Sequence, residues 1–103
     1  LKKDYKNRSI FKVLDYQLDI NKKVIVKNDL KLKLTEKEIT LLVYLIESGK
    51  PVKINELLKV VWDYSSESET HTIETHVHRL RKKFIKIFKD ENIIKNNSEG
   101  YFI

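Results

Sequence analysis

The side chains best suited to chemistry lie between residues 70 and 89, in a stretch that reads THTIETHVHRLRKKFIKIFK. From Thr72 to Lys89 the stretch holds six Lys or Arg residues and a single acid, Glu74. Such side chains donate hydrogen bonds to phosphates and to the acceptor edges of bases. At about 100° per residue, one side of a helix would carry His71, Thr75, His78, Arg79, Lys82, Lys86 and Lys89. The pattern indicates a nucleic-acid-binding helix, and the plainer interpretation is a solvated helix face.

Other kinds of site find little support in the sequence. The chain has no cysteine, which excludes disulfides, thiolate zinc sites and cysteine nucleophiles. On a helix His76 and His78 would project about 160° apart, so they cannot share a metal ion, and His71 with His78 would offer only two ligands. There is no glycine-rich phosphate loop and no recognisable Ser/His/Asp spacing. We therefore expect no metal site, no cofactor and no enzyme activity.

The charge of the chain favours a polyanionic partner. The formal net charge is +6 and the isoelectric point is about 9.4, which by itself supports only non-specific attraction. A chain of 103 residues that is 41% hydrophobic suits one domain with a modest core. The longest apolar run, residues 41–46, is too short to cross a bilayer, so we expect no membrane association and a cytoplasmic location. The first residue is Leu1, which suggests a piece of a longer protein.

The basic stretch also has an apolar side that would fix it to a core. Ile73, Val77, Leu80, Phe84 and either Ile87 or Phe88 fall within one stripe at helical spacing. A helix with one apolar and one basic side packs against the protein and leaves its basic side free. The apolar stripe thus predicts that the basic side chains are presented outwards.

Two shorter helices are predicted ahead of the basic one. The sequence TEKE at residues 35–38 is a capping box, and Gly49 and Pro51 mark the end of the helix that it starts. This is the core helix, because apolar residues surround much of it: Ile39, Leu41, Leu42, Val43, Leu45 and Ile46. The second helix carries the stripe Ile54, Leu57, Leu58 and Val61 and closes at Trp62. Its cap stays open between two interpretations, since Asn55 suits a cap by type but the stripe places Ile54 inside the helix.

Short alternating segments flank the helices. Residues 10–34 contain four of them, separated by turn residues such as those at 21–22 and 28–29, which is typical of an antiparallel meander. Near the end, residues 93–95 and 101–103 are predicted to be strands joined by a turn at residues 97–100, and such a hairpin beside a groove-binding helix would be a wing. Residues 1–9 are interpreted as the remnant of an interdomain linker, residues 10–103 as the domain, and residues 63–69 as an acidic loop.

Four segments, in their order and spacing, resemble the C-terminal effector domain of OmpR/PhoB-type response regulators. They are LTEKEITLLVYL, ELLKVVW, HTIETHVHRLRKKF and EGYFI. The resemblance covers nearly the whole chain from residue 10. It implies an α+β fold, a winged helix-turn-helix with a four-stranded N-terminal antiparallel sheet, three helices and a C-terminal β-hairpin wing. Residues 72–89 would then be the recognition helix in the major groove of DNA.

The resemblance also implies roles for individual residues. Arg79 stands where the family commonly has a base-reading Arg, which can bond to O6 and N7 of guanine, and His78 is its neighbour. Lys95 and Asn97 belong to the implied wing. Contacts with DNA phosphates are implied for Trp62, His71, Thr72, His76, Arg81, Lys82, Lys83 and Tyr101.

Three positions depart from the family's pattern. His71 replaces a common Arg, so a phosphate contact there would be weaker or dependent on pH. Asn97 and Ser98 stand where the wing usually has Arg and Gly, so the cation that favours insertion into a narrow minor groove is missing. Lys53 and Ile54 occupy the places of a frequent Ser cap and its following Arg, and Lys53 is expected to substitute for that Arg.

Two hypotheses from different classes result. The first is sequence-specific binding of double-stranded DNA by the output domain of a bacterial two-component response regulator, bound as a homodimer to tandem half-sites. A receiver domain outside this chain and its cognate histidine kinase would control it, and residues 63–70 would contact RNA polymerase. The alternative is a winged-helix protein-interaction module with little DNA specificity, using the acidic loop. A helix lying on a membrane is disfavoured, because the core needs its apolar stripe.

Overall fold

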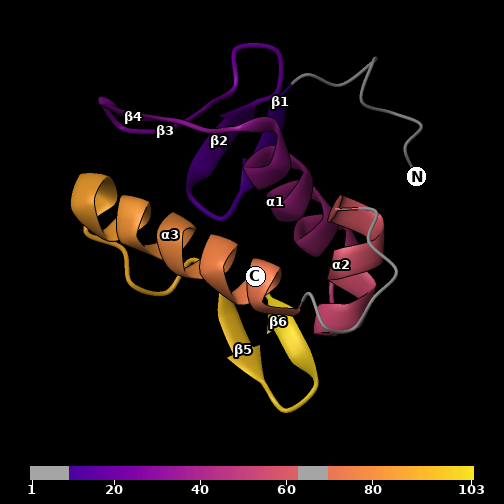
Figure 1. The fold of residues 1–103 in the computed structure, drawn as a ribbon. Helices are drawn as coiled ribbons and strands as arrows, with labels where there is room; N and C mark the ends of the chain where they lie inside the picture. Colours follow the sequence, from indigo (N-terminus) through magenta and orange to yellow (C-terminus); the bar gives the residue numbers. More distant parts are fainter. Residues whose placement is uncertain (1–9, 63–69) are drawn as a thin grey trace.

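The computed structural model describes residues 10–62 and 70–103, and its elements follow the order expected for a winged helix (Figure 1). A four-stranded sheet comes first, three helices follow, and a two-stranded hairpin ends the chain. The fold class predicted from the sequence is confirmed. The elements are β1 (Ile10–Val13), β2 (Tyr16–Asp19), β3 (Val24–Lys27), β4 (Leu30–Lys33), α1 (Glu36–Ser48), α2 (Ile54–Trp62), α3 (Thr70–Phe88), β5 (Lys95–Asn97) and β6 (Gly100–Phe102).

The first sheet is an antiparallel meander in the order β1-β2-β3-β4. Its register aligns one residue from each strand, because Phe11 pairs with Leu18, Leu18 with Ile25, and Ile25 with Leu32. All four side chains are buried, so they form an apolar row across the inner face. Successive side chains on a strand point to opposite faces, which leaves Lys31 and Lys33 exposed on either side of Leu32.

Helix α1 starts at the predicted capping box. The hydroxyl of Thr35 accepts a hydrogen bond from the backbone N–H of Glu38 at 3.2 Å, and the Glu38 carboxylate accepts one from the N–H of Thr35 at 2.9 Å. The helix ends at Gly49, whose φ of 64° is left-handed and favours glycine. The predicted apolar set lies in the core, with Ile46 at its edge.

The structure decides where α2 begins. The N–H of Leu57 donates to the carbonyl of Lys53 at 3.1 Å, so Lys53 precedes the first turn and Ile54 lies within the helix. The stripe of Leu57, Leu58 and Val61 is buried, and Trp62 at the helix end is 8% exposed. Burial of the stripe thus prevails over the capping preference of Asn55. The α1 side chain Lys37 donates to the Val61 carbonyl at 3.0 Å, which links the two helices.

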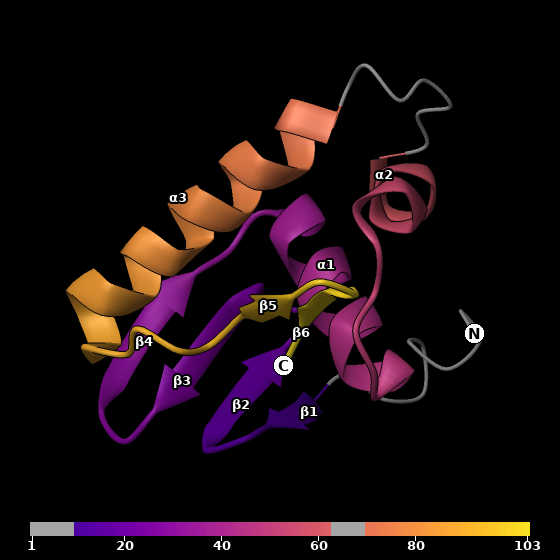
Figure 2. The same ribbon diagram turned by 90° about the horizontal axis from the view of Figure 1, so that it is seen from below.

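Helix α3 is the longest described element, and it runs beside β4 at one end and beside α2 at the other (Figures 1 and 2). The predicted stripe of Ile73, Val77, Leu80, Phe84 and Phe88 is buried, with Ile87 at its edge. The C-terminal half of α3 packs beside β4.

An aromatic cluster attaches the end of α3 to the sheet. The Tyr16 ring meets Phe84 and Phe88 edge to face, with ring centroids 5.3 and 4.9 Å apart. Its hydroxyl donates to Asp90 at 2.6 Å. Burial, followed by the hydrogen bond to Asp90, raises the pKa of Tyr16. Aromatic pairs of this kind contribute about 0.5–1.5 kcal/mol beyond the area that they bury.

The C-terminal hairpin begins later than predicted. Its first strand is β5, starting at Lys95, so the prediction of a strand over residues 93–95 is wrong for Ile93 and Ile94. Both isoleucines are buried, 1% and 2% exposed, whereas neighbouring side chains of a strand point to opposite faces. The pair instead fixes the base of the hairpin to the core. In the turn Asn97 pairs with Gly100, and the Asn97 side chain accepts a bond from the N–H of Glu99 at 2.7 Å.

Candidate nucleic-acid interface

The exposed side of α3 carries the side chains that the sequence assigns to base reading. Arg79 and His78 are both exposed, and so are Thr75 and Lys82 on the same helix. Each is on the side opposite the buried stripe, which packs against the core as the periodicity predicts. Because both side chains are exposed, the guanidinium and imidazole groups can bond to a ligand that lies along the helix.

Arg81 points to the hairpin instead. Its Nε and Nη2 donate to the carbonyl of Ile94 at 3.0 and 2.7 Å, and Nη2 also donates to the Asn96 side chain at 3.0 Å. The guanidinium lies 5.7 Å from the centroid of the Tyr101 ring. Three hydrogen bonds and a cation–π contact thus hold β5 and β6 against α3. Two N–H groups on Nη1 remain for a further partner, because Arg has five donors.

Lys83 points to the other flank of α3. Its ammonium bonds to both carboxylate oxygens of Glu38, at 2.8 and 3.0 Å. The Glu38 side chain is only 6% exposed, and it also caps α1. Lys83 therefore fixes α3 to the start of α1, and one of its three donors is left. The capping box predicts the position of Glu38 at the helix start, but no signal in the sequence points to its pairing with Lys83.

His76 packs on Trp62. The two ring centroids lie 4.8 Å apart at an angle of 50°, which joins α3 to the end of α2. Burial lowers the pKa of His76, the positive charge of Arg79 lowers it further, and the Glu38 carboxylate partly opposes the shift. At neutral pH His76 is an uncharged imidazole, which can donate one hydrogen bond to a phosphate. The other member of this region, Thr72, is partly exposed, whereas the side chain of His71 lies outside the described residues.

The wing hairpin, β5 and β6 with their turn, is fixed to the body at Val52. The N–H of Val52 donates to the Tyr101 carbonyl at 2.8 Å and the Tyr101 N–H donates back at 2.9 Å, so the loop before α2 pairs with β6. Tyr101 is 9% exposed, and burial raises the pKa of its hydroxyl. Val52 is a single apolar residue between Pro51 and Lys53, so no periodic pattern in the sequence predicts its role.

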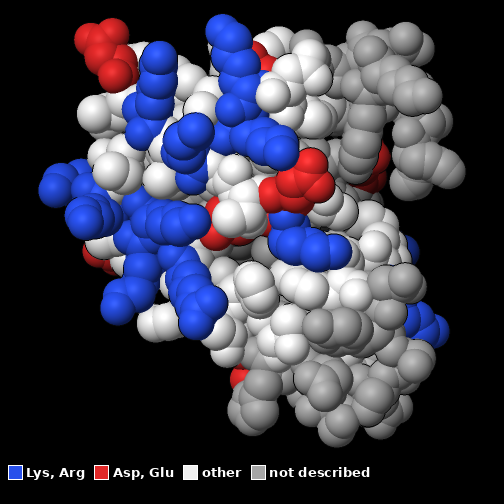
Figure 3. Space-filling view, turned by 45° about the horizontal axis from the view of Figure 1, so that its top comes forward, with Lys and Arg blue, Asp and Glu red and all other residues white. Residues whose placement is uncertain are grey.

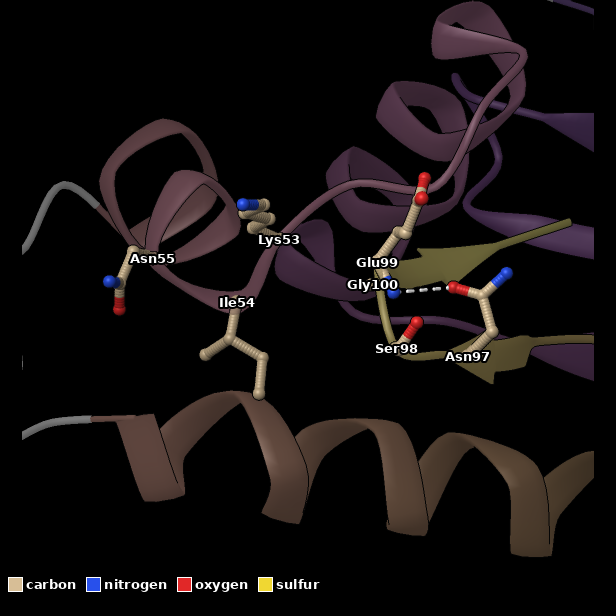
Figure 4. Close-up of a pocket in the computed structure, with 7 residues that line it drawn as sticks. All are labelled: Lys53, Ile54, Asn55, Asn97, Ser98, Glu99 and Gly100. Atoms are coloured by element: carbon tan, nitrogen blue, oxygen red, sulfur yellow. Dashed lines mark hydrogen bonds between the residues drawn. The ribbon is translucent and has the colours of Figure 1, made fainter.

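An open cleft of about 360 Å³ lies between the start of α2 and the wing turn (Figure 4). Lys53, Asn55, Asn97 and Glu99 line it with neutral neighbours, and the hydrogen bond from the Glu99 N–H to Asn97 spans the turn. One Lys and one Glu leave this cleft without net charge. It is therefore a poor phosphate site, although Lys53 remains the candidate contact at the entry to α2.

Basic side chains gather over α3 and the adjoining strands. In Figure 3 the sheet side is turned towards the viewer, and Lys and Arg cover the region of α3, β3 and β4 with few acids among them. Two acids in the first turn of α1 are bonded to lysines, Glu38 to Lys83 and Glu36 to Lys23 at 3.2 Å. The surface is positive as a whole, which suits a polyanion.

Residues 10–62 and 70–103 include no group of three or more His, Cys, Asp or Glu placed to hold a metal ion. None of the helices there combines the length and the apolar character needed to cross a membrane.

Comparison with known proteins decides the family. The profile of the family described as "Transcriptional regulatory protein, C terminal" matches residues 29–103. The chain belongs to this family. It is thus a C-terminal effector domain of a transcriptional regulator, of the OmpR/PhoB type. The family is a class of transcriptional regulators and not of enzymes.

Individual relatives agree with this placement. The chain is 37% identical over 87 residues to a probable transcriptional regulator ycf27 from Cyanidium caldarium, covering 79% of this chain and 35% of the relative. It is 29% identical over 96 residues to the transcriptional regulatory protein CusR from Escherichia coli K12, covering 92% of this chain and 42% of CusR. The chain therefore spans less than half the length of these relatives.

Solved structures show the same fold. The DNA-binding domain of CadC from Escherichia coli matches with a TM-score of 0.77 at 24% identity, over 93% of this chain and 92% of that one. The DNA-binding domain of CpxR from Escherichia coli matches with a TM-score of 0.75 at 23% identity, over 93% and 96% of the two chains.

Proposed function

We propose that this effector domain binds double-stranded DNA in a sequence-specific manner, with α3 in the major groove and Arg79 and His78 against base edges. The observation that supports the proposal is that the basic side chains of α3 differ in their contacts. Arg81 and Lys83 are bonded within the protein and fix the helix on both flanks, whereas Arg79 is exposed between them. An α-helix about 10–12 Å across fits a groove about 12 Å wide.

Phosphate contacts would then surround the reading residues. Lys82 is exposed, and Trp62, Thr72 and His76 lie at the junction of α2 and α3, where a backbone beside the groove would pass. Tyr101 would contact a phosphate from the wing, and Lys95 and Asn97 are exposed on the same hairpin. Such contacts set the orientation of the protein without specifying sequence. Arg81 and Lys83 would add contacts through the donors that they have left, and His71 completes the proposed set.

The wider setting is also a proposal. The relatives are much longer than this chain, which supports a receiver domain outside it, controlled by a cognate histidine kinase, with residues 1–9 as the linker and residues 10–103 as the effector domain. The regulator would act in the cytoplasm as a homodimer on tandem half-sites. Residues 63–70 would contact RNA polymerase, and residues 63–69 lie outside the described residues.

The Arg79 guanidinium provides the test. Preferred duplexes are selected from a random pool with the unaltered domain, and affinity is measured by fluorescence anisotropy on the selected and on a scrambled duplex. Arg79→Ala should cost about 1–3 kcal/mol on the selected duplex and much less on the scrambled one. Arg79→Lys keeps the charge but cannot bond bidentately, so it should retain scrambled binding and lose preference.

Equal losses on both duplexes would assign Arg79 to a phosphate and contradict base reading. A domain that selects no sequence at all would instead favour the protein-interaction module, for which the observation in favour is the wing, since it carries no Arg.

A further inference from the structure

The two flanks of α3 are built differently. Arg81 and Lys83 are two positions apart, so they project about 160° apart around the helix. Arg81 bonds to the wing, and Lys83 bonds to Glu38 at the start of α1. Glu38 in turn accepts from the N–H of Thr35, two residues beyond the end of β4. One flank of the recognition helix is thus formed by the wing, and the opposite flank by β4 and the start of α1.

A helix in the major groove has a sugar-phosphate backbone on each side. The groove is only slightly wider than the helix, so structures that flank the helix must lie close to these backbones. If the wing follows one backbone, the flank at β4 faces the other. This step rests on the proposed function, namely that α3 occupies the groove.

The charges of the two flanks are unequal. Residues 95–102, which form the wing, contain Lys95 and Glu99 as their only charged residues, so the wing has no formal net charge. On the other flank Lys31 and Lys33 of β4 and Lys86 of α3 are all exposed. None of the three forms an ion pair with another described residue.

The two β4 lysines are fixed in direction by the strand. They stand on either side of buried Leu32 and therefore share the face of the sheet opposite to it. Helix α3 packs beside β4, which is an edge strand of the sheet. The basic region in Figure 3 extends over both elements. Ammonium groups that pair with no described residue, on a strand next to a groove-binding helix, are placed as phosphate contacts.

We propose that Lys31 and Lys33, with Lys86, form a second phosphate-binding surface, which holds the backbone on the side of the major groove away from the wing. Its ligand is the phosphodiester backbone of the same duplex that α3 reads. The neutral wing contributes little attraction, so this surface supplies much of the salt-dependent part of binding. Because phosphates carry no sequence information, the surface raises affinity without changing preference.

The test is the salt dependence of anisotropy-measured affinity for a selected and a scrambled duplex, between about 50 and 200 mM salt. Each phosphate contact adds about 0.9 to the slope of log K against log salt, so Lys31→Gln with Lys33→Gln should lower the slope by about 1.8. The ratio of selected to scrambled affinity should stay the same. Shortening the selected duplex on the side away from the wing should lower the slope of the unaltered domain in the same way.

A control pair removes the same charge elsewhere. Lys12 is exposed on β1, at the opposite edge of the sheet, and Lys50 is exposed beyond the far end of the 13-residue helix α1. Lys12→Gln with Lys50→Gln should leave the slope within a few tenths of the unaltered value. Urea unfolding of both double variants should match the unaltered domain, since exposed substitutions usually change stability by under about 0.5 kcal/mol.

Equal slopes for the two double variants, or a change of sequence preference on removing Lys31 and Lys33, would overturn this proposal. Both outcomes leave specific binding by α3 intact. Failure of the unaltered domain to bind any duplex would instead remove the proposed function itself.

Discussion

At the scale of the residue, Arg81 and Lys83 show that basic side chains of α3 can stabilise the fold through bonds within the protein. The family resemblance groups both of them with Lys82 as contacts for DNA phosphates. The structure separates them, because Arg81 meets the Ile94 carbonyl and Lys83 meets buried Glu38. Their partners come from distant parts of the chain, so helical periodicity cannot reveal the pairing.

His76 gives the domain a dependence of stability on pH. Its pKa is lowered in the folded state, so below the ordinary histidine pKa of about 6.5 the unfolded chain binds a proton that the folded domain resists. The contribution of His76 to stability is therefore complete above that pH and falls as the pH drops towards the lowered pKa. His76→Gln should reduce the loss of stability between pH 7.5 and 5.5, measured as the shift in the urea midpoint of unfolding.

Replacement of exposed His78 by Gln is the matched control and should keep the full loss. If both variants lose the same amount of stability between pH 7.5 and 5.5, burial of His76 against Trp62 does not control the protonation of His76.

At the scale of the element, the wing depends on a close contact that only glycine allows. Gly100 has a φ of 137°, and a Cβ there would lie 2.2 Å from the Val52 carbonyl oxygen, which itself accepts the N–H of Tyr101. The pairing between the wing and the loop before α2 therefore requires the bare backbone at this position. The sequence shows the glycine and predicts a turn, but it cannot show that Val52 lies against it.

Gly100→Ala should destabilise the domain by about 1–3 kcal/mol for the backbone alone, with the contact at Val52 adding to it. For a domain of this size each kcal/mol lowers the melting temperature by about 4–8 °C. Gly49→Ala is the matched comparison, since its φ of 64° is strained but no atom lies within 4 Å of the added Cβ. It should cost only about 1–2 kcal/mol.

Equal melting temperatures for these two variants would mean that the wing yields to the added methyl group without losing its pairing with Val52.

Local signals explain how much of the fold the sequence predicts. The capping box, the apolar stripes and the strand alternation each depend on neighbours a few residues apart, and each is confirmed. The predicted start of β5 is wrong because Ile93 and Ile94 are residue types that favour strands. In the structure, the surrounding core buries both side chains, which a strand would point to opposite faces. The exposure of Arg79 follows from helical periodicity. The hydrogen bonds of Arg81 to Ile94 and of Lys83 to Glu38 do not.

At the scale of the molecule, helix α3 is held between two flanking structures that differ in charge. The wing is neutral and tied to α3 through Arg81, and the sheet side is basic and tied through Lys83. With α3 in the major groove as proposed, this asymmetry would give the domain a direction on DNA. Head-to-tail copies on tandem half-sites would repeat that direction about one helical turn apart, which is about 10–10.5 base pairs.

The central claim is that the domain reads duplex DNA through α3. Its most direct test is fluorescence anisotropy of the unaltered domain on a duplex from the promoter of its own gene and on a scrambled duplex, from about 50 to 200 mM salt. The account predicts a steep slope of log K against log salt on both duplexes and clearly tighter binding to the promoter. Equal affinity for the two, together with no preferred sequence in a random pool, would contradict it.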